Sequence, residues 1–202
     1  MLTYYPNPKK IFVKGDREFS DREKKEIAAC WKGGVDGAVI AVAEYSAEIL
    51  LCELVAYSAV YAFLHGGKID VQPLCVSGRV ICEGSFLVGK RSKQVSTYAG
   101  CWELCPSGII DQSSLLPDGS VDINHAVLKE LYEETGIRSV QAVRPIGIYR
   151  EKIWDICLDI YVQKGTTFSS GEEYDLVQWM NPHAKIEGAW VPLSEELLKL
   201  PI

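Results

Sequence analysis

Three glutamates crowd one face of a helix predicted in the second half of the chain. The segment Lys129–Ile137 reads KELYEETGI, and Glu130, Glu133 and Glu134 are spaced i, i+3 and i+4. A helix therefore brings the three carboxylates together. Like charges at this spacing repel each other, and Mg²⁺, which prefers oxygen ligands and bridges carboxylates to phosphates, would relieve the repulsion. The pattern indicates a metal site, with an ordinary solvated acidic face as the alternative because glutamate favours helices.

The segments around this helix favour an α+β fold. Apolar runs typical of strands lie on both sides of the glutamate helix, which is expected over Asp122–Thr135. The expected strands are Val71–Cys82, Ser85–Arg91, Val140–Tyr149, Ile153–Val162, Tyr174–Trp179 and Gly188–Val191, and a last helix is expected at Ser194–Leu200. Strands on both sides of one central helix, with a second helix at the end, predict an α+β sandwich.

The first 70 or so residues predict a smaller α/β unit. Two helices that each stop at a pair of glycines enclose two apolar strands. The expected helices are Ser20–Lys32 and Val55–His65, and the expected strands are Ala38–Ala43 and Glu48–Glu53. We therefore expect two domains, an N-terminal α/β extension over residues 1–70 and a second domain over residues 71–202.

The composition argues against several classes of protein. The 202 residues are 48% apolar and 24% charged, and the net charge of −6 does not suit a nucleic-acid-binding surface. Met1–Ile11 lacks the apolar run of a secretory signal, and the longest uncharged apolar stretch, Leu54–Gly67, is too short to span a membrane. The seven cysteines form no C-x-x-C pair, which predicts reduced thiols in a cytoplasmic protein.

The glutamate segment resembles the second half of the Nudix box, R-E-U-x-E-E-x-G-U, where U is an aliphatic residue. Six of the seven defined positions match, and Lys129 stands where the family has arginine. The resemblance implies a Nudix α/β/α sandwich with a mixed sheet. It also implies that Glu130, Glu133 and Glu134 bind Mg²⁺, or Mn²⁺, and that Lys129, Glu133 and Glu134 take part in catalysis. Lysine neutralises charge but lacks the planar fork with which arginine holds two carboxylates.

Two further segments resemble the family and supply expected substrate-binding residues. Cys105–Gly108 reads CPSG, like the P-G-G or P-S-G turn at the start of the box, so Gly108 is the expected first glycine. Ser85–Ser92 reads SFLVGKRS and resembles the family strand that ends in Arg-Ser. Its Arg91 and Lys90 are cations that an acidic chain needs near a phosphorylated substrate. A pair of solvated charges at a strand end is the alternative.

The spacing inside the box departs from the family pattern. From Gly108 onward the chain is longer than the standard box, and counting back from Lys129 places Val121 where the family has its first glutamate. We therefore infer an insertion around Gln112–Ser120. Asp122 or Asp118 is the expected substitute for the missing carboxylate.

The C-terminal region supplies the expected general base. Ala189–Leu197 resembles the family ending W-V-P-L-x-E-L, and Glu187 lies just upstream on a predicted loop. Several Nudix enzymes take a metal ligand or a base from this region, so Glu187 is the expected base, with Glu172 and Glu173 as rivals. Such a base deprotonates a metal-bound water that attacks phosphorus. A plain surface glutamate is the alternative.

The chain also resembles one particular branch of the Nudix family. The N-terminal extension, the long insertion and the motifs at Val71–Ser77 and Leu87–Ser92 are similar to those of enzymes that split UDP-sugars into UMP and sugar 1-phosphate. The resemblance implies a hydrolase that cleaves the diphosphate linkage of a nucleoside diphosphate derivative such as UDP-glucose. The expected partner is this small molecule, with no nucleic acid and no membrane, and the sequence predicts no oligomeric state.

The sequence leaves three alternatives open. Gly84–Lys90 matches the G-x4-G-K of a P-loop, but arginine follows where Ser or Thr should bind Mg²⁺. Arg91–Lys93, Trp102 and Cys105 resemble isopentenyl-diphosphate isomerases, which share the Nudix fold, although the residues after the cysteine differ. A non-catalytic Nudix module that binds a nucleotide or a protein partner would explain Lys129 and the missing glutamate.

Overall fold

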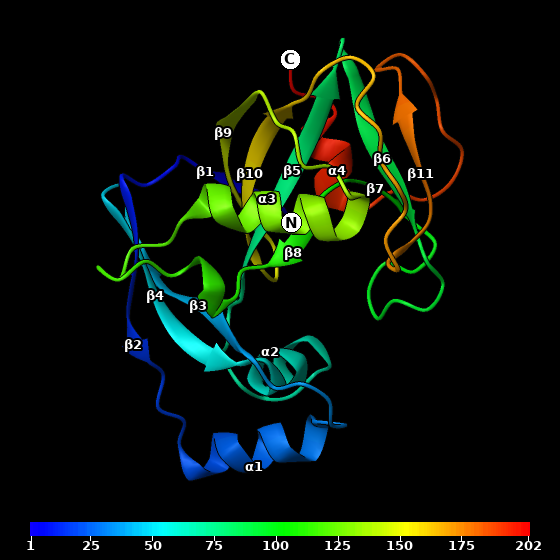
Figure 1. Cartoon of the computed structure of the whole chain (residues 1–202). Helices are drawn as coiled ribbons and strands as arrows, with labels where there is room; N and C mark the ends of the chain where they lie inside the picture. Colours follow the sequence, from blue (N-terminus) through cyan, green and yellow to red (C-terminus); the bar gives the residue numbers. More distant parts are fainter.

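A large mixed sheet forms the centre of the computed structural model, which describes residues 1–202 (Figure 1). Its main path runs through β1 (Thr3–Tyr5), β9 (Ala142–Arg150), β10 (Trp154–Tyr161), β5 (Leu74–Cys82), β6 (Ser85–Arg91) and β11 (Tyr174–Met180). Two short strands lie off this path, β7 (Trp102–Leu104) beside β6 and β8 (Ser107–Ile109) beside β5. β5 and β10 run parallel, and the other neighbours run antiparallel.

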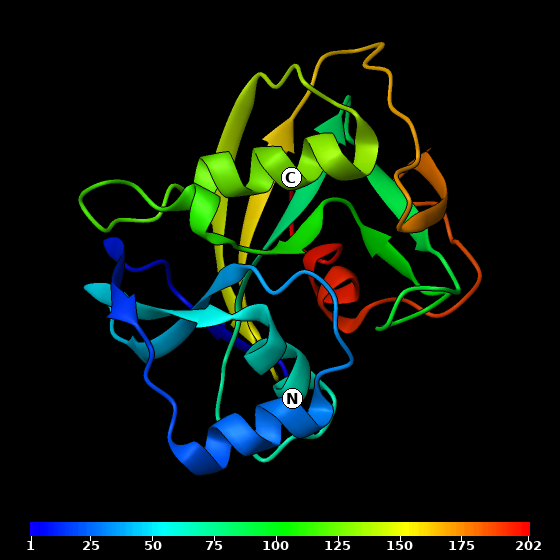
Figure 2. The ribbon, with the colours of Figure 1, turned by 60° about the horizontal axis from the view of Figure 1, so that its bottom comes forward.

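Two helices cover opposite faces of this sheet. α3 (Ile123–Thr135) lies on one face and α4 (Pro192–Leu197) on the other (Figures 1 and 2). The alternation along β10 shows how both faces are filled, because successive side chains of a strand point to opposite sides. Ile156 packs in the core cluster that includes α3, and the next residue, Cys157, packs in the cluster that includes α4. The expected α+β fold, an α/β/α sandwich with a mixed sheet, is confirmed.

An opening within the sheet positions the polar residues of the site. β5 and β6 pair only next to the turn that joins them, and then separate. β8 pairs with β5 and β7 pairs with β6 in the space between them, and the chain crosses from β7 to β8 at Cys105–Pro106. Because of this separation, residues of β7 and β8 come directly under α3, where Ser107 bonds to Glu134.

The N-terminal unit contains a second, three-stranded sheet in the order β2 (Lys10–Asp16), β4 (Ile49–Ala56) and β3 (Ala38–Tyr45). Its two helices, α1 (Asp21–Cys30) and α2 (Tyr57–Leu64), pack together at the bottom of Figure 1. A capping box between Ser20 and Glu23 starts α1. β1 precedes this unit in the chain but pairs with β9 of the large sheet.

Some secondary-structure elements differ from those that the sequence predicts. Gly188–Val191, expected as a strand, forms a single bridge between Trp190 and Trp102. The sequence patterns do not predict β1, β2, β7 and β8. Three of these strands have three residues each, too few for an alternating period to be visible, and β2 mixes charged residues with a glycine. No helix has the length and apolar character that crossing a membrane would require.

A buried carboxylate lies within the large sheet. Asp155 of β10 is 4% exposed, and its Oδ2 accepts a hydrogen bond of 3.0 Å from the Ser77 hydroxyl, whereas its Oδ1 has no partner. Burial raises the pKa of Asp155 to about 7, and the hydrogen bond from Ser77 opposes this rise. The folded protein therefore retains a proton that the unfolded chain releases near pH 4.

Replacing Asp155 with asparagine should flatten the dependence of stability on pH. Between about pH 4 and 7 the folded state binds more protons than the unfolded chain, so rising pH lowers the stability of the wild type. Asp155→Asn is expected to be more stable than the wild type by on the order of 4 kcal/mol at pH 8, and equal to it below pH 4. Denaturant unfolding at several pH values measures the difference. The exposed Asp175→Asn is the control, and identical pH profiles for Asp155→Asn and the wild type would contradict the prediction.

Candidate active site

The helix α3 presents two of the three predicted glutamates, Glu130 and Glu134, to β8, and the third, Glu133, to Lys129. The helix begins at Asp122, whose Oδ1 accepts a 2.9 Å hydrogen bond from the His125 N–H, and it ends at Gly136, which has a φ of +70°. Leu131 is fully buried and anchors the helix on the sheet. The three glutamates differ in exposure, because Glu134 is 5% exposed whereas the side chains of Glu130 and Glu133 are 17% and 53% exposed.

Glu134 is held by hydrogen bonds from two strands. Its Oε1 accepts a 3.1 Å bond from the Ser107 N–H, and its Oε2 lies 2.8 Å from the Tyr174 hydroxyl. The same hydroxyl lies 2.8 Å from Glu103 Oε1. Burial raises the pKa of Glu134 well above its usual range, and the Glu103 carboxylate adds to the rise. Since the phenol has one hydrogen to donate, the second short contact requires a proton on one of the carboxyl groups.

Glu130 lies against the backbone of Gly108. A Cβ atom at position 108 would be 2.2 Å from Glu130 Oε2, so only glycine leaves room for this carboxylate. Burial raises the pKa of Glu130 to about 7; Lys129 opposes the rise, and Glu133 adds to it. The predicted first glycine of the box therefore faces a predicted metal ligand.

The Lys129 ammonium lies among three carboxylates. Its Nζ is 2.9 Å from Asp111 Oδ2, 3.7 Å from Glu133 Oε2 and 4.0 Å from Glu130 Oε1. Burial lowers the pKa of Lys129, but the hydrogen bond and charge of Asp111, followed by the charges of the glutamates, raise it overall. The positive charge that the structure places at the glutamate face of α3 is therefore the side chain of Lys129 itself.

The carboxylates on this face of α3 suit a hard divalent cation. Their ligand atoms are all carboxylate oxygens, which Mg²⁺ and Mn²⁺ prefer, and the ammonium of Lys129 shows that the space between Glu130 and Glu133 attracts positive charge. The side chains do not converge into a group of three metal-ligating residues. The oxygen ligands of Glu130, Glu133 and Glu134 thus suit the metal by their chemical type, and these three residues are the candidates.

A buried network that the sequence reasoning missed supports Glu134 from the other side. Arg91 at the end of β6 donates from Nη1 to the Glu103 carboxylate and from Nε to the Thr97 carbonyl at 3.1 Å. Glu103 and Arg91 are buried, and burial raises the pKa of Glu103 while the Arg91 charge lowers it. The Tyr174 ring crosses Gly89, where a Cβ atom would be 2.5 Å from the ring.

Strand pairing explains how this network assembles. Gly89 of β6 pairs with Glu103 of β7, and Arg91 of β6 pairs with Tyr174 of β11. The only signal in the sequence is that Glu103 interrupts an otherwise apolar stretch, Trp102–Leu104. That signal does not distinguish a site residue from a solvent-facing one.

Two other expected site residues, Lys90 and Glu187, have neighbours outside α3. Lys90 is exposed, and its Nζ lies 5.9 Å from the centre of the Trp102 ring. Glu187 is also exposed, and its carbonyl accepts a 3.2 Å hydrogen bond from the Trp102 indole. Neither side chain forms a hydrogen bond or ion pair with a glutamate of α3. Of the rival loop glutamates, Glu173 reaches the network, since its Oε2 is 3.7 Å from Arg91 Nη2.

The expected substitutes for the missing glutamate serve local turns. Asp118 accepts hydrogen bonds from the N–H and hydroxyl of Ser120, and Asp122 caps α3. Val121 packs against the main core. The carboxylates that the structure brings near the α3 glutamates are instead Glu103 and Asp111, the second of which lies directly before the predicted insertion.

Comparison with solved structures shows which fold this is. A MutT Nudix hydrolase of Burkholderia pseudomallei is similar with a TM-score of 0.51, covering 64% of this chain and 98% of its own, at 16% identity. The DR0079 protein of Deinococcus radiodurans is similar with a TM-score of 0.56, covering 79% of this chain and 96% of its own, at 13% identity. No family model and no curated protein matches the sequence. The chain therefore has the fold of the Nudix hydrolases.

Proposed function

We propose that this protein is a Mg²⁺-dependent hydrolase that cleaves the diphosphate linkage of a nucleoside diphosphate derivative. The observation that carries the proposal is the position of Lys129, whose ammonium lies among Asp111, Glu130 and Glu133 on the face next to the buried Glu134. So many carboxylates at one place are stable only with cations among them. A diphosphate carries further negative charge to this face, which makes a divalent cation part of the proposed site.

Glu130, Glu133 and Glu134 are proposed to hold the Mg²⁺, with Mn²⁺ as a substitute. When bound, the metal neutralises the diphosphate and lowers the pKa of a water molecule. Lys129 neutralises the remaining charge of the glutamates, and it takes the place of the arginine in the family motif. Gly108 leaves the space that Glu130 needs against β8.

The proposed proton acceptor and phosphate-binding cations follow from the motifs of the sequence. Glu187 is the proposed general base, and Glu173, which reaches Arg91, is its rival. Lys90 is exposed and free to meet a phosphate oxygen. Arg91 already donates to Glu103 and to the Thr97 carbonyl, so its proposed contact with phosphate uses its remaining N–H groups.

The motifs of the sequence support a nucleotide sugar such as UDP-glucose as the substrate, with UMP and a sugar 1-phosphate as the products. They also support a cytoplasmic enzyme with a division into residues 1–70 and 71–202. The isomerase alternative is disfavoured by Cys105, which has no exposed surface and whose pKa is raised by burial well above the usual range. A buried neutral thiol does not suit a catalytic cysteine. A non-catalytic binding module stays the second candidate because Val121 replaces the box glutamate.

Hydrolysis assays with Mg²⁺ test the proposed function. UDP-glucose, ADP-ribose, NADH, dinucleoside polyphosphates and nucleoside triphosphates are offered separately, and release of a nucleoside monophosphate is measured. Glu134→Gln removes one proposed metal ligand while keeping the side-chain volume, and it should lower turnover at least about 100-fold. The control is Glu195→Gln, an exposed glutamate of α4. If the protein hydrolyses none of these compounds, or if Glu134→Gln retains full turnover, the proposal is wrong.

Gly108→Ala tests whether Glu130 is a metal ligand. The added Cβ would lie 2.2 Å from Glu130 Oε2, so the carboxylate must move away from β8. We expect Mn²⁺ affinity, measured by calorimetry, to fall about tenfold or more, with a circular dichroism spectrum like that of the wild type. Ser107→Ala is the control, because it keeps the N–H that donates to Glu134 and adds no atom near Glu130. Unchanged Mn²⁺ affinity in Gly108→Ala would argue against Glu130 as a ligand.

A further inference from the structure

A hollow between the two units opens next to the candidate active site. Its volume is about 380 Å³, which is within the range of small-molecule pockets. The N-terminal unit contributes Val35, Val39 and Tyr57 to its lining. The last residue of β8, Ile109, and the segment after it, with Asp111 and Gln112, contribute the rest. In Figures 1 and 2, β8 lies between α3 on one side and α2, which begins at Tyr57, on the other. The hollow and the glutamates of α3 therefore flank the same strand.

Shared residues connect the hollow to the proposed metal site. Asp111 lines the hollow, and its Oδ2 is 2.9 Å from the Lys129 ammonium. Ile109 is the residue after Gly108, which lies against Glu130. Asp111 thus belongs both to the lining of the hollow and to the carboxylates around Lys129.

We propose that this hollow binds the nucleobase of the substrate. The inference rests on the proposed hydrolysis of a nucleoside diphosphate derivative, and it assigns the base-binding part of that same site. The diphosphate then reaches the glutamates of α3 by way of Asp111 and Lys129, and the group on the far side of the diphosphate lies outside the hollow.

The chemistry of the lining favours a base over a sugar. Val35, Ile109 and the ring of Tyr57, which Trp31 meets edge-on at 6.0 Å, offer apolar and aromatic surface that suits the flat face of a heterocycle. Each hydroxyl of a buried sugar would need a polar partner, and the Asp111 carboxylate is already bonded to Lys129 and Ser113. Gln112 is exposed at the edge of the hollow, where its amide is available to the polar edge of a base.

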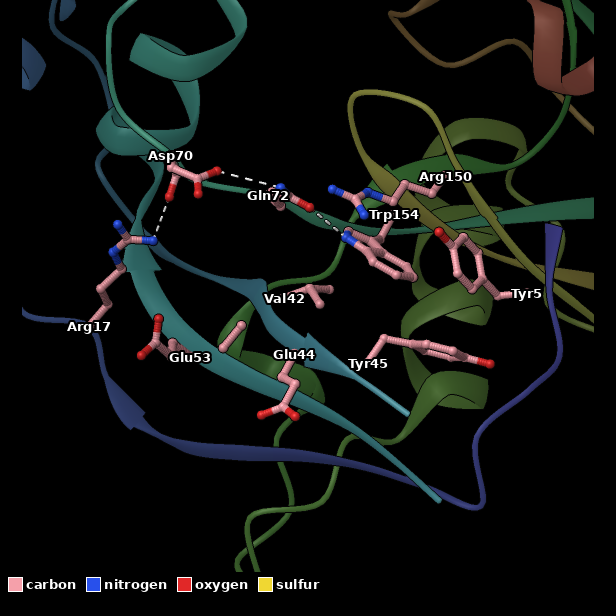
Figure 3. A pocket seen from close by; sticks show the side chains of 11 residues that line it. Tyr5, Arg17, Val42, Glu44, Tyr45, Glu53, Asp70, Gln72, Arg150 and Trp154 are labelled. Atoms are coloured by element: carbon pink, nitrogen blue, oxygen red, sulfur yellow. Dashed lines mark hydrogen bonds between the residues drawn. The ribbon is translucent and has the colours of Figure 1, made fainter. Parts of the chain in front are cut away.

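A larger hollow elsewhere in the chain provides an internal comparison. Its volume is about 450 Å³, and it is lined by Tyr45, Trp154 and Arg150, among others (Figure 3). Here the aromatic faces are occupied by neighbours: the Tyr45 and Trp154 rings stack 5.6 Å apart, and the Arg150 guanidinium lies 4.8 Å from the centre of the Trp154 ring. None of its lining residues belongs to the proposed metal site or contacts Lys129.

Binding of reaction products tests the proposal without requiring turnover. UMP and glucose 1-phosphate are titrated separately, in the presence of Mg²⁺, into the wild type, Tyr57→Ala and Tyr57→Phe. Tyr57→Ala should weaken UMP binding about tenfold and leave glucose 1-phosphate unchanged, while Tyr57→Phe, which keeps the ring, should bind UMP like the wild type. Tyr45→Ala, which alters the other hollow, is the matched control and should bind both compounds normally.

A second variant tests the same hollow in case Tyr57→Ala does not fold. Val35 is 90% exposed, so Val35→Asp does not disturb the core, and it places a negative charge at the hollow. It should weaken UMP binding severalfold by repelling the phosphate and by removing apolar contact with the base. The melting temperature of each variant shows that it is folded.

The outcomes separate this proposal from the proposed function. Weaker UMP binding in both Tyr57→Ala and Val35→Asp supports the base site, even if the protein hydrolyses no diphosphate and the proposed function fails. Unchanged UMP binding in both folded variants overturns the base site, whether or not hydrolysis is observed. Selective loss of glucose 1-phosphate binding overturns it in favour of a sugar site, and loss of UMP binding in Tyr45→Ala alone overturns it in favour of the other hollow.

Discussion

The burial of several carboxyl groups beneath α3 determines how the rest of the site is arranged. Glu103 and Glu134 are both buried and meet at one tyrosine hydroxyl, and Glu130 is buried over most of its side chain. Carboxylates in such surroundings require cations or hydrogen-bond donors, because an unpaired buried charge costs several kcal/mol. Arg91 meets this need for Glu103, and Lys129 meets it for Glu130. The separation of β5 from β6 is what lets strand residues reach these carboxylates.

The segment Gln112–Ser120, which the sequence predicts to be an insertion, is tied to the N-terminal unit by hydrogen bonds at its end. The Val13 N–H donates to the Gly119 carbonyl at 2.9 Å, and the Val121 N–H donates to the Ile11 carbonyl at 3.2 Å. A Cβ atom at position 119 would lie 2.6 Å from the Phe12 ring, which requires glycine there. This segment therefore packs along β2, and the partly buried Val121 packs against the core. An apolar side chain suits this position, since a carboxylate at the partly buried Val121 would lose contact with water.

Features that depend on neighbouring residues in the sequence can be predicted, whereas features that depend on the pairing of distant strands cannot. The spacing of Glu130, Glu133 and Glu134 places them on one helical face whatever surrounds the helix, and the apolar periods of the longer strands similarly predict the layers. Glu103 and Tyr174 are close only because β7, β6 and β11 pair in one particular register, which no local pattern reveals. The sequence likewise shows Arg91 as a charge at a strand end but not its bond to Glu103.

Lysine at position 129 suits this particular set of carboxylates. An arginine fork binds two oxygens in one plane, whereas an ammonium group donates in three directions. Lys129 lies among Asp111, Glu130 and Glu133, and Asp111 comes from the segment that enters the insertion. Lysine therefore matches an extra carboxylate that a chain without this segment would not place there. The same ion pair joins the glutamate face of α3 to the hollow lined by Asp111, so that a ligand touching Asp111 changes the charge balance around Glu130 and Glu133.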